Sequence, residues 1–385
     1  MLVAAALIAL LLPYTALSCT SVLDCSGAGA CASSACVCLP GFVGPTCAQL
    51  DNRTVLRVDS GFRVANTSVW GSQVVLGDDG AYHMVASVFP GDLDFYSVWL
   101  LQAQIVHATA PTPFGPFTLR GVALGYGAED AWDRSVMNPK LLRAPDGTWL
   151  LFYTGDGYPG PWPTPAHPAP VDPRVPQANQ RVGLAVAASP AGPFVRTGAP
   201  VLQPRAGAWD ARITTNPAVT LMQNGSLLMI YKASNPSGYN TSQRQVCFGV
   251  AWSPNWRTPF ARARDDPILA CPPNSFLFED PCVFFTPATG FYHLLFKDFS
   301  GTVTHEGYSG AHAVSEDGVH WAFTQPALAY TTTHLWSDGV VRKQKQQERP
   351  QVLLAADGAP LGIYYATNTG LDGKSEFWNM YQPLR

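Results

Sequence analysis

The stretch NPKLLRAPDGTWLLFY, residues 138–153, contains the pattern that decides the fold. A short apolar segment follows a proline, a turn comes next, and a second apolar segment follows the turn. Asp146-Gly147 favours a tight hairpin, because both central residues of a type I′ turn need a positive φ. The pattern occurs five times. Its first segments are 70–76, 138–142, 216–221, 280–285 and 349–354, its turns are Asp79-Gly80, Asp146-Gly147, Asn224-Gly225, Thr289-Gly290 and Asp357-Gly358, and its second segments are 82–86, 149–153, 227–231, 291–296 and 361–365.

Further strands extend each unit. A third segment of small residues recurs at 105–108, 182–187, 248–252 and 310–314, and a turn with an aromatic residue follows each one. Repeats of roughly 60 to 80 residues indicate propeller blades, so we predict an all-β, five-bladed β-propeller with four-stranded blades. Residues 377–381 belong to the short fifth blade, which residues around 54–64 would complete, removing an exposed edge. The alternative is a β-sandwich, whose strands would not recur in this order. Residues 159–176 are expected to form a long loop in the second blade.

The composition agrees with a folded protein rich in turns. Of 385 residues, 47% are hydrophobic and 13% charged, with 34 glycines and 34 prolines. So many prolines leave little room for long helices. The net charge of −3 gives no basic surface for nucleic acid or for an anionic membrane.

The first 18 residues resemble a secretory signal peptide. An apolar run, 2–12, precedes small residues, with Ala16 and Ser18 placed for cleavage. The alternative is a membrane anchor, but the run is shorter than the roughly 20 residues that a span needs. We therefore expect a secreted protein without a stable membrane span. Four sequons for N-glycosylation agree with that compartment: Asn52, Asn66, Asn224 and Asn240.

Six of the nine cysteines lie within 29 residues, in the segment 19–50. A zinc knuckle is the alternative to a disulfide framework, but the segment contains no histidine. The spacing C-x5-C-x5-C-x4-C-x-C-x8-C, with its CLPGFVGPTC ending, resembles an epidermal-growth-factor-like module. That resemblance implies the pairs Cys19–Cys31, Cys25–Cys36 and Cys38–Cys47. It also suggests a protein or cell-surface partner, or a spacer role.

Three cysteines remain outside this segment. Cys271 and Cys282 are 11 residues apart and could close a loop. Cys247 lies in the apolar run 246–252 and is expected to be a buried free thiol.

The innermost strands of a propeller line its axis, so the residues that open them should converge at one mouth of the channel. Acids, amides, an arginine and an aromatic residue gathered there suit a polyhydroxyl ligand. The openings are Trp70, Asn138, Asn216, Asp280 and Arg349, preceded in the later blades by Met137, Thr215, Glu279 and Glu348.

The second domain, 51–385, resembles the five-bladed propeller glycosidases, the group that contains arabinanases, β-xylosidases and invertases. The resemblance covers roughly residues 66–385. The similar segments are Asn138-Pro139 with Asp146-Gly147, 278–281, 315–321 and 348–350. The resemblance implies a carbohydrate substrate and catalytic acids at the starts of inner strands, usually two aspartates and a glutamate on the first three blades. This sequence departs from that pattern, since Trp70-Gly71, Asn138 and Asn216 stand where acids are expected.

Glycoside hydrolysis commonly needs two carboxyl groups beside the scissile bond. We predict Glu348 together with Glu279 or Asp280, because these residues come from adjacent blades. Neighbouring strand residues point to opposite sides, so Glu279 and Asp280 are not both expected to face the axis. Arg349 would orient a partner or an acidic substrate group. Further substrate-binding candidates are Asp133, Asp210, His305 and Glu306. The structural alternative is that Asp280 or Glu348 only pairs with Arg349.

Three functions follow from these patterns. The first is a secreted glycoside hydrolase. The second is a carbohydrate-binding propeller without turnover, which the two asparagines favour because amides neither give nor take protons at neutral pH. The third is an extracellular adhesion protein that binds through its cysteine-rich module. No cofactor or metal site is predicted, and whether a calcium ion occupies the channel stays open.

Overall fold

The computed structural model describes residues 18–158, 160–167, 174–235, 245–272, 275–276, 278–368 and 377–385. The expected signal peptide, apart from its last residue, and the Asn240 sequon lie outside the described residues, as does part of the 159–176 loop.

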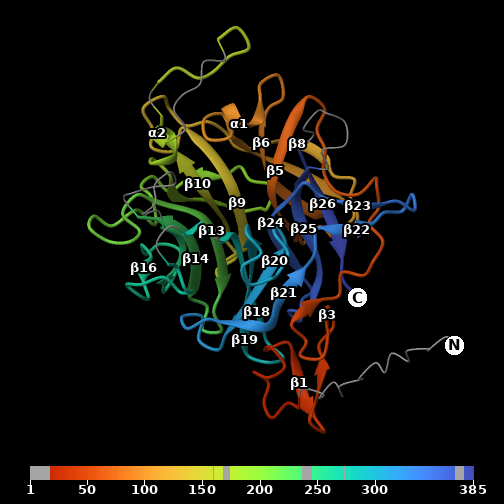
Figure 1. Cartoon of the computed structure of the whole chain (residues 1–385). Coiled ribbons are helices and arrows are strands. Elements are labelled where there is room, and N and C mark those ends of the chain that lie inside the picture. Colours follow the sequence, from red (N-terminus) through yellow and green to blue (C-terminus); the bar gives the residue numbers. More distant parts are fainter. Residues whose placement is uncertain are drawn as a thin grey trace, which may run out of the picture.

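Five antiparallel sheets surround a common axis and form a β-propeller (Figure 1). Blade one is β5 (Thr67–Leu76), β6 (Tyr82–Pro90), β7 (Gln104–Ala110) and β8 (Thr118–Leu124); blade two is β9 (Ser135–Arg143), β10 (Trp149–Asp156), β11 (Arg181–Ala187) and β12 (Val195–Arg196); blade three is β13 (Ile213–Leu221), β14 (Leu227–Ser234), β15 (Gln245–Ser253) and β16 (Ala261–Arg262), with β17 (Ser275–Phe276) beside β15; blade four is β18 (Phe278–Thr286), β19 (Phe291–Asp298), β20 (Gly310–Ser315) and β21 (Ala322–Tyr330); blade five is β24 (Gln346–Leu354), β25 (Pro360–Asn368) and β26 (Trp378–Pro383). The remaining elements are α1 (Phe95–Val98), α2 (Arg174–Gln177) and the hairpin of β22 (Thr333–Leu335) and β23 (Val341–Lys343).

The inner strands close into a ring. Each inner strand contacts the next, from β5 through β9, β13 and β18 to β24, and β24 contacts β5. Phe62 pairs with Asn379 of β26, through Phe62 N–H to Asn379 O (2.8 Å) and Asn379 N–H to Phe62 O (3.1 Å). The predicted five-bladed propeller is therefore confirmed, and a residue from the 54–64 segment pairs with the fifth blade.

The second strands lie inside the apolar layers between blades. Every residue of β10, β14 and β19 is buried, which explains why these segments read as nearly continuous apolar runs. Phe152 of β10 and Tyr231 of β14 belong to one such layer, which joins blades two and three.

A β-bulge interrupts every inner strand at the same point. The pairing with the second strand shifts by one residue there, and one residue of each bulge has a positive φ, which allows its side chain a direction that regular strand geometry forbids. The five residues are Gly71 (59°), Asn138 (57°), Asn216 (50°), Asp280 (59°) and Arg349 (55°). Gly71, not Trp70, is thus the blade-one counterpart of Asn138, which corrects the expected alignment; Trp70 corresponds to Met137, Thr215, Glu279 and Glu348.

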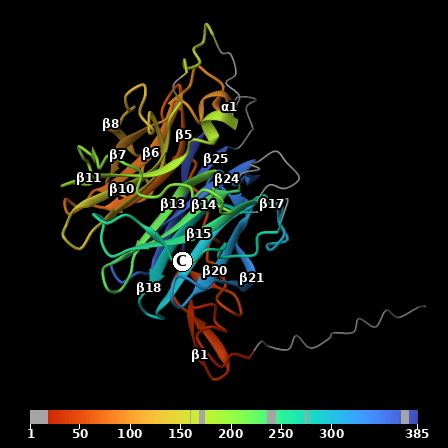
Figure 2. The same cartoon turned by 90° about the vertical axis from the view of Figure 1, so that its left-hand side faces the viewer.

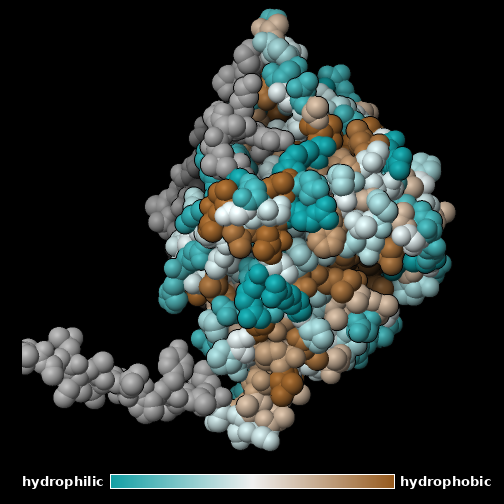
Figure 3. Space-filling model, turned by 90° about the vertical axis from the view of Figure 1, so that its right-hand side faces the viewer, coloured by the Kyte–Doolittle hydropathy of each residue, from teal (hydrophilic) through white to brown (hydrophobic). Residues whose placement is uncertain are grey.

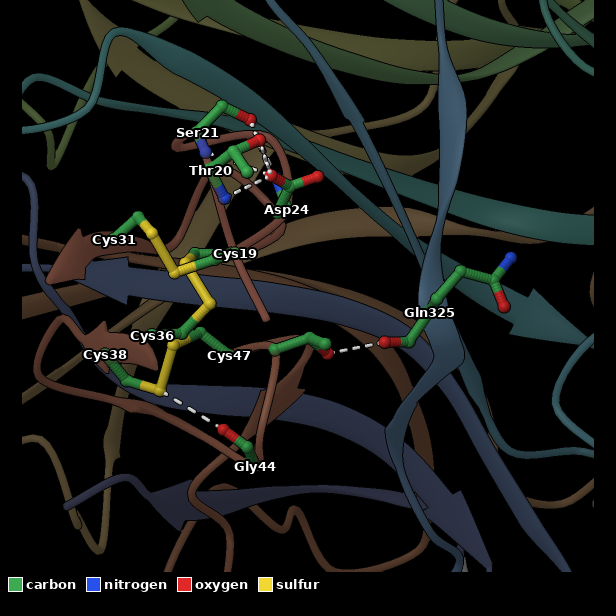
Figure 4. Close-up of a disulfide and its surroundings, with 12 residues drawn as sticks. Cys19, Thr20, Ser21, Asp24, Cys31, Cys36, Cys38, Gly44, Cys47 and Gln325 are labelled. Atoms are coloured by element: carbon green, nitrogen blue, oxygen red, sulfur yellow. Dashed lines mark hydrogen bonds between the residues drawn. A yellow bond between two sulfur atoms is a disulfide. The ribbon is translucent and has the colours of Figure 1, made fainter. Parts of the chain in front are cut away.

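The cysteine-rich segment forms a small module below the propeller in Figures 1 and 2. It contains the hairpin of β1 (Gly29–Ala32) and β2 (Ala35–Cys38) and the short pair β3 (Phe42–Val43) and β4 (Gln49–Leu50). Its disulfides, drawn in Figure 4, are Cys19–Cys31, Cys25–Cys36 and Cys38–Cys47. These are the pairs that the resemblance implies.

The module is docked on blades four and five. Phe42 packs against the rings of His293 and His312, and His312 Nδ1 lies 2.7 Å from Ala48 O. Thr46 also donates to Gln325 O at 2.5 Å. In the space-filling view the surface of the module continues directly into that of the propeller (Figure 3). The module and the propeller therefore share a core.

Two expectations about the remaining cysteines are wrong. Cys247 of β15 forms a disulfide with Cys271, and Cys282 is the buried free thiol. The reason is the connection between blades three and four: β17 runs parallel to β15, and Gln245 Nε2 donates to Cys271 O at 3.0 Å. Cys271 is thereby held beside Cys247, while Cys282 belongs to an inner strand.

None of the helices in the described residues has the length and apolar character of a membrane span.

Candidate active site

A pocket of about 300 Å³ lies where the inner strands begin. It is lined by residues from all five blades and by the loops above them. The lining residues are Trp70, Phe89, Phe95, Tyr96, Trp99, Met137, Asn138, Gln177, Gln180, Asn216, Lys232, Glu279, Asp280, Phe299, Gln346, Glu348 and Arg349. The propeller thus brings together Trp70, Asn138, Asn216, Glu279, Asp280, Glu348 and Arg349, all of which the sequence predicts at one mouth of the channel.

The bulge residues of blades two to five form a hydrogen-bonded arc. Asn138 Nδ2 donates to Asn216 Oδ1 (2.8 Å), and Asn216 Nδ2 donates to Asp280 Oδ1 (3.0 Å). Arg349 Nη1 donates to the same Asp280 oxygen (2.9 Å), and the Arg349 backbone N–H donates to Asp280 Oδ2 (3.2 Å). Gly71 completes the ring, since a Cβ there would lie 3.3 Å from Arg349 Nε. Both oxygens of Asp280 are therefore engaged by the protein.

The expectation that Glu279 and Asp280 cannot both face the axis is wrong, because both line the pocket. Regular strand alternation would separate them, but Asp280 has φ 59° and occupies the bulge. The bulge turns the Asp280 carboxylate toward Asn216 and Arg349, while Glu279 keeps its direction into the pocket.

Two lysines reach across blade boundaries to the glutamates. Lys232 of β14 forms an ion pair with Glu279 of blade four, and Lys297 of β19 forms an ion pair with Glu348 of blade five. Glu279 and Glu348 keep 16% and 13% of their side-chain surface exposed, toward the pocket that they line.

The lysines occupy a repeated position. In each blade, one residue of the second strand pairs with the residue just before the bulge of the inner strand. These pairs are Trp70–Ser87, Met137–Thr154, Thr215–Lys232, Glu279–Lys297 and Glu348–Ala366. In the first two blades the hydroxyl accepts from the backbone of the next blade, as Ser87 Oγ does from Asn138 N–H and Thr154 Oγ1 from Asn216 N–H. Ion pairs replace these hydrogen bonds where the next blade carries a glutamate.

The three carboxyl groups form a tight cluster. One oxygen each of Glu279, Asp280 and Glu348 lies within 4.8 Å of the others. Burial raises the pKa of Glu348 to about 7; Lys297 opposes this rise, and the nearby charges of Asp280 and Glu279 add to it. Because Lys232, Lys297 and Arg349 pair with the three acids, the cluster has no excess negative charge with which to hold a metal cation.

The opposite wall of the pocket is aromatic. Trp70 packs against Phe95 of α1 and against Phe377, with ring centroids 5.5 and 5.4 Å apart. Phe95 also stacks on Phe377 at 4.2 Å. Tyr96 extends this wall and is 54% exposed. One side of the pocket is therefore ionic and the other is flat and apolar.

Asp133 and Asp210 lie elsewhere. Neither lines the pocket, and both side chains are buried. Asp133 accepts from Tyr153 Oη (2.7 Å) and Arg196 Nε (2.8 Å). Asp210 accepts from Tyr231 Oη in the next blade (3.1 Å). Their shared Ala-Trp-Asp sequence (131–133 and 208–210) marks a repeated anchor, and the geometry gives these aspartates a structural role.

His305 and Glu306 are also outside the pocket. His305 is exposed with φ 61°, and Glu306 Oε1 accepts from Thr332 N–H and Oγ1. Their loop nevertheless begins beside Phe299, which does line the pocket.

Lys232 and Lys297 are not among the residues predicted from the sequence, although the sequence contains a signal for them. Each lysine directly follows the predicted second segment of its blade (227–231 and 291–296), at the same distance from its hairpin turn. The aromatic residues Phe89, Phe95, Tyr96 and Trp99 were not predicted either, because they lie at the end of β6 and in the connection after it, outside the repeated pattern.

No protein-family model matches the sequence. No curated protein is significantly similar to it.

Solved structures do share the fold. A family 117 glycoside hydrolase from the marine bacterium Zobellia galactanivorans superimposes with a TM-score of 0.55 at 17% identity, over 85% of this chain and 87% of that one. An α-L-arabinofuranosidase from Lactobacillus brevis gives 0.56 at 14% identity, over 86% and 92% of the two chains. A thermostable family-43 glycoside hydrolase gives 0.55 at 16%, over 86% and 91%. The chain therefore has the five-bladed architecture found in glycoside hydrolases.

Proposed function

We propose that the axial pocket binds a terminal sugar of an oligo- or polysaccharide and hydrolyses its glycosidic bond. The observation that carries this proposal is the pair Glu279 and Glu348, which have oxygens within 4.8 Å of each other and come from adjacent blades. Hydrolases that retain the anomeric configuration place their two carboxyl groups about 5–5.5 Å apart, whereas inverting ones need roughly 6.5–9.5 Å to admit a water. The short spacing favours retention.

Glu348 is assigned the acid role, because its pKa of about 7 keeps a proton available near neutrality. In the first step Glu279 attacks the anomeric carbon, the bond to the leaving oxygen breaks, and that oxygen takes the electron pair and the Glu348 proton. In the second step Glu348 takes a proton from water, which attacks the same carbon and releases Glu279. Lys232 holds the attacking carboxylate in place.

Asp280 is proposed as a positioning residue. Asn216 and Arg349 occupy its oxygens, so it holds the bulge and contributes negative charge beside Glu348. Of the candidates predicted from the sequence, Trp70, Asn138, Asn216 and Arg349 are proposed to contact the sugar. The aromatic wall suits the C–H face of a sugar ring, and the ring of bulge residues at the base of the pocket favours attack from a chain end.

A second candidate function is sugar binding without turnover. It is favoured by the fact that Glu279, Asp280 and Glu348 each already have a cationic partner. An extracellular adhesion role through the cysteine-rich module is a further proposal, which the resemblance of this module to epidermal-growth-factor-like modules suggests.

The test uses the secreted full-length chain and a panel of aryl glycosides. Glu348→Gln is expected to lower kcat by 10²- to 10⁴-fold on substrates with poor leaving groups, since general acid catalysis has that magnitude. Glu279→Ala should lose turnover, and azide should restore it. Glu316→Gln, at an exposed site, is the control. Sugar binding by wild type without turnover on any substrate would instead support the second function.

We further propose that residues 1–18 are removed during secretion, that the mature chain is divided into a module (19–50) and a propeller (51–385), and that Asn52, Asn66, Asn224 and Asn240 carry glycans. Asn66 and Asn224 are exposed, as glycosylation requires, and Asn52 is half-buried. Mass spectrometry before and after glycosidase treatment tests these sites.

A further inference from the structure

A second pocket, of about 810 Å³, lies at the other mouth of the channel. The distal halves of the inner strands line it, together with Tyr82, Trp149 and Leu361, and it shares no lining residue with the proposed active site. Leu354 belongs to its wall and also packs against the apolar cluster that contains Phe42 of the cysteine-rich module. This distal pocket is therefore flanked by the module.

Lys140 of β9 forms part of the distal pocket and is only 7% exposed. Its Nζ donates to Gln73 Oε1 (2.9 Å) and to Gln351 Oε1 (3.3 Å), which are neutral amide oxygens. Among the described residues no carboxylate forms an ion pair with Lys140. An ammonium group has three donors, so one remains for a ligand. Burial lowers the pKa of Lys140, which reflects the cost of an uncompensated charge at this position.

The lining of the distal pocket has cations but no carboxylate. Arg143, at the rim, is half-exposed and pairs with Asp78 outside the pocket. Most other lining residues are apolar, such as Val75, Val219 and Val283. A sugar would find few hydrogen-bonding partners on these walls, and a cation would be repelled. The lining fits a molecule with an anionic head and an apolar body.

We propose that the distal pocket is a second binding site, for a single-chain organic carboxylate whose head group binds Lys140 and whose alkyl chain lies along the apolar walls. A head with one negative charge matches the single buried ammonium, whereas a doubly charged phosphate would need a second buried cation. This site is independent of the proposed hydrolysis.

The test is calorimetric titration of the full-length chain with octanoate, 1-octanol and acetate. Octanoate should bind about tenfold or more tightly than 1-octanol, the gain expected from a hydrogen bond to a charged group. It should also bind more tightly than acetate, which lacks the alkyl chain that the apolar walls would bury. In Lys140→Met, which keeps an unbranched side chain but removes the charge, octanoate should lose its preference over octanol. Arg143→Met, at the rim of the same pocket, should keep the preference. Equal binding of octanoate and octanol to the wild type would overturn the proposal.

A second measurement needs no variant, in case Lys140→Met does not fold. Octanoate carrying a photoreactive diazirine on its tail is expected to label peptides from 73–76, 140–143 or 352–356 of the wild type. Excess octanoate should prevent this labelling and acetate should not. Labelling confined to other segments would contradict the assignment.

Discussion

Lys297 of the fourth blade forms an ion pair with Glu348 of the fifth, from the position at which the first blade has Ser87 and the second Thr154. The pair spans a blade boundary, so the ionisation of Glu348 depends on how two blades meet. Burial raises the pKa of this carboxyl group and Lys297 holds it down, and the balance lies at about 7.

The first prediction concerns this balance. Replacement of Lys297 by methionine removes the nearest positive charge, so the protonated form of Glu348 should persist to higher pH. The alkaline limb of the kcat/KM profile should move upward by about one unit or more, as loss of an adjacent opposite charge usually causes. Lys343→Met, at an exposed site, is the control. An unchanged limb would show that Lys297 does not set this pKa.

The second prediction concerns the wild-type profile. The acid must carry its proton, so kcat/KM should fall as pH rises through about 7. The measurement is the initial rate with an aryl glycoside between pH 5 and 9. Glu348→Gln cannot titrate, and its residual activity should lack this limb. If the limb persists in that variant, the proton donor is another group.

The third prediction tests the ring of bulges. Gly71 has φ 59° and lies against Arg349, so Gly71→Ala should destabilise the fold by roughly 1–2 kcal/mol from backbone strain alone, with a further cost from the contact. Gly339→Ala is the matched control, because Gly339 also has a positive φ (79°) and has nothing within 4 Å of an added Cβ. Urea denaturation of both variants should show the larger loss for Gly71→Ala; equal losses would remove the steric argument.

The fourth prediction concerns acid stability. His293 and His312 are fully buried at the docked module, and burial lowers the pKa of His312 to about 4 and that of His293 well below its ordinary value. In the unfolded chain both histidines take up a proton near pH 6.5, whereas in the folded chain they stay neutral at that pH. The free energy of unfolding should therefore be unaffected by these histidines above about pH 6.5 and should decrease as the pH falls from there toward 4.

Thermal melts between pH 4 and 8 check this decrease. His312→Gln should reduce the pH dependence below pH 6.5, while His293, His107 and His334, whose pKa values burial also lowers, keep part of it. His320→Gln should not, because His320 is exposed and pairs with Asp317 on the surface. If the melting temperature of His312→Gln falls with pH as steeply as that of the wild type, other groups cause the acid sensitivity.

The fifth prediction concerns the thiols. Four disulfides leave Cys282 as the one free cysteine of nine, and it is buried. A thiol reagent should therefore detect none in the native protein and one per chain after unfolding without reductant. Two or more thiols under those conditions would contradict the Cys247–Cys271 pair.

Much of the fold could be predicted because local sequence patterns determine it. The hairpin turns, the second strands and the meeting of strand openings all repeat along the sequence, and a repeat needs no knowledge of long-range contacts. That the segment 54–64 pairs with the fifth blade could be inferred, since this blade is short, and the structure supplies the pair Phe62 with Asn379.

The rest depended on three-dimensional features that leave weaker traces. Strand alternation gave the wrong directions for Glu279 and Asp280, because it takes no account of a positive φ before a proline. The contact between Lys232 and Glu279 depends on the stagger of neighbouring blades. Cys247 meets Cys271 through the course of a connection rather than through their spacing.

The pairing of Phe62 with Asn379 also bears on how the protein is made. The cysteine-rich module emerges early from the ribosome and can complete its crosslinks at once, but the strands on which it rests, in blades four and five, are synthesised last. During synthesis the nascent chain therefore holds an open arc of blades with an undocked module. The ring of blades can close only when residues 378–383 have been added.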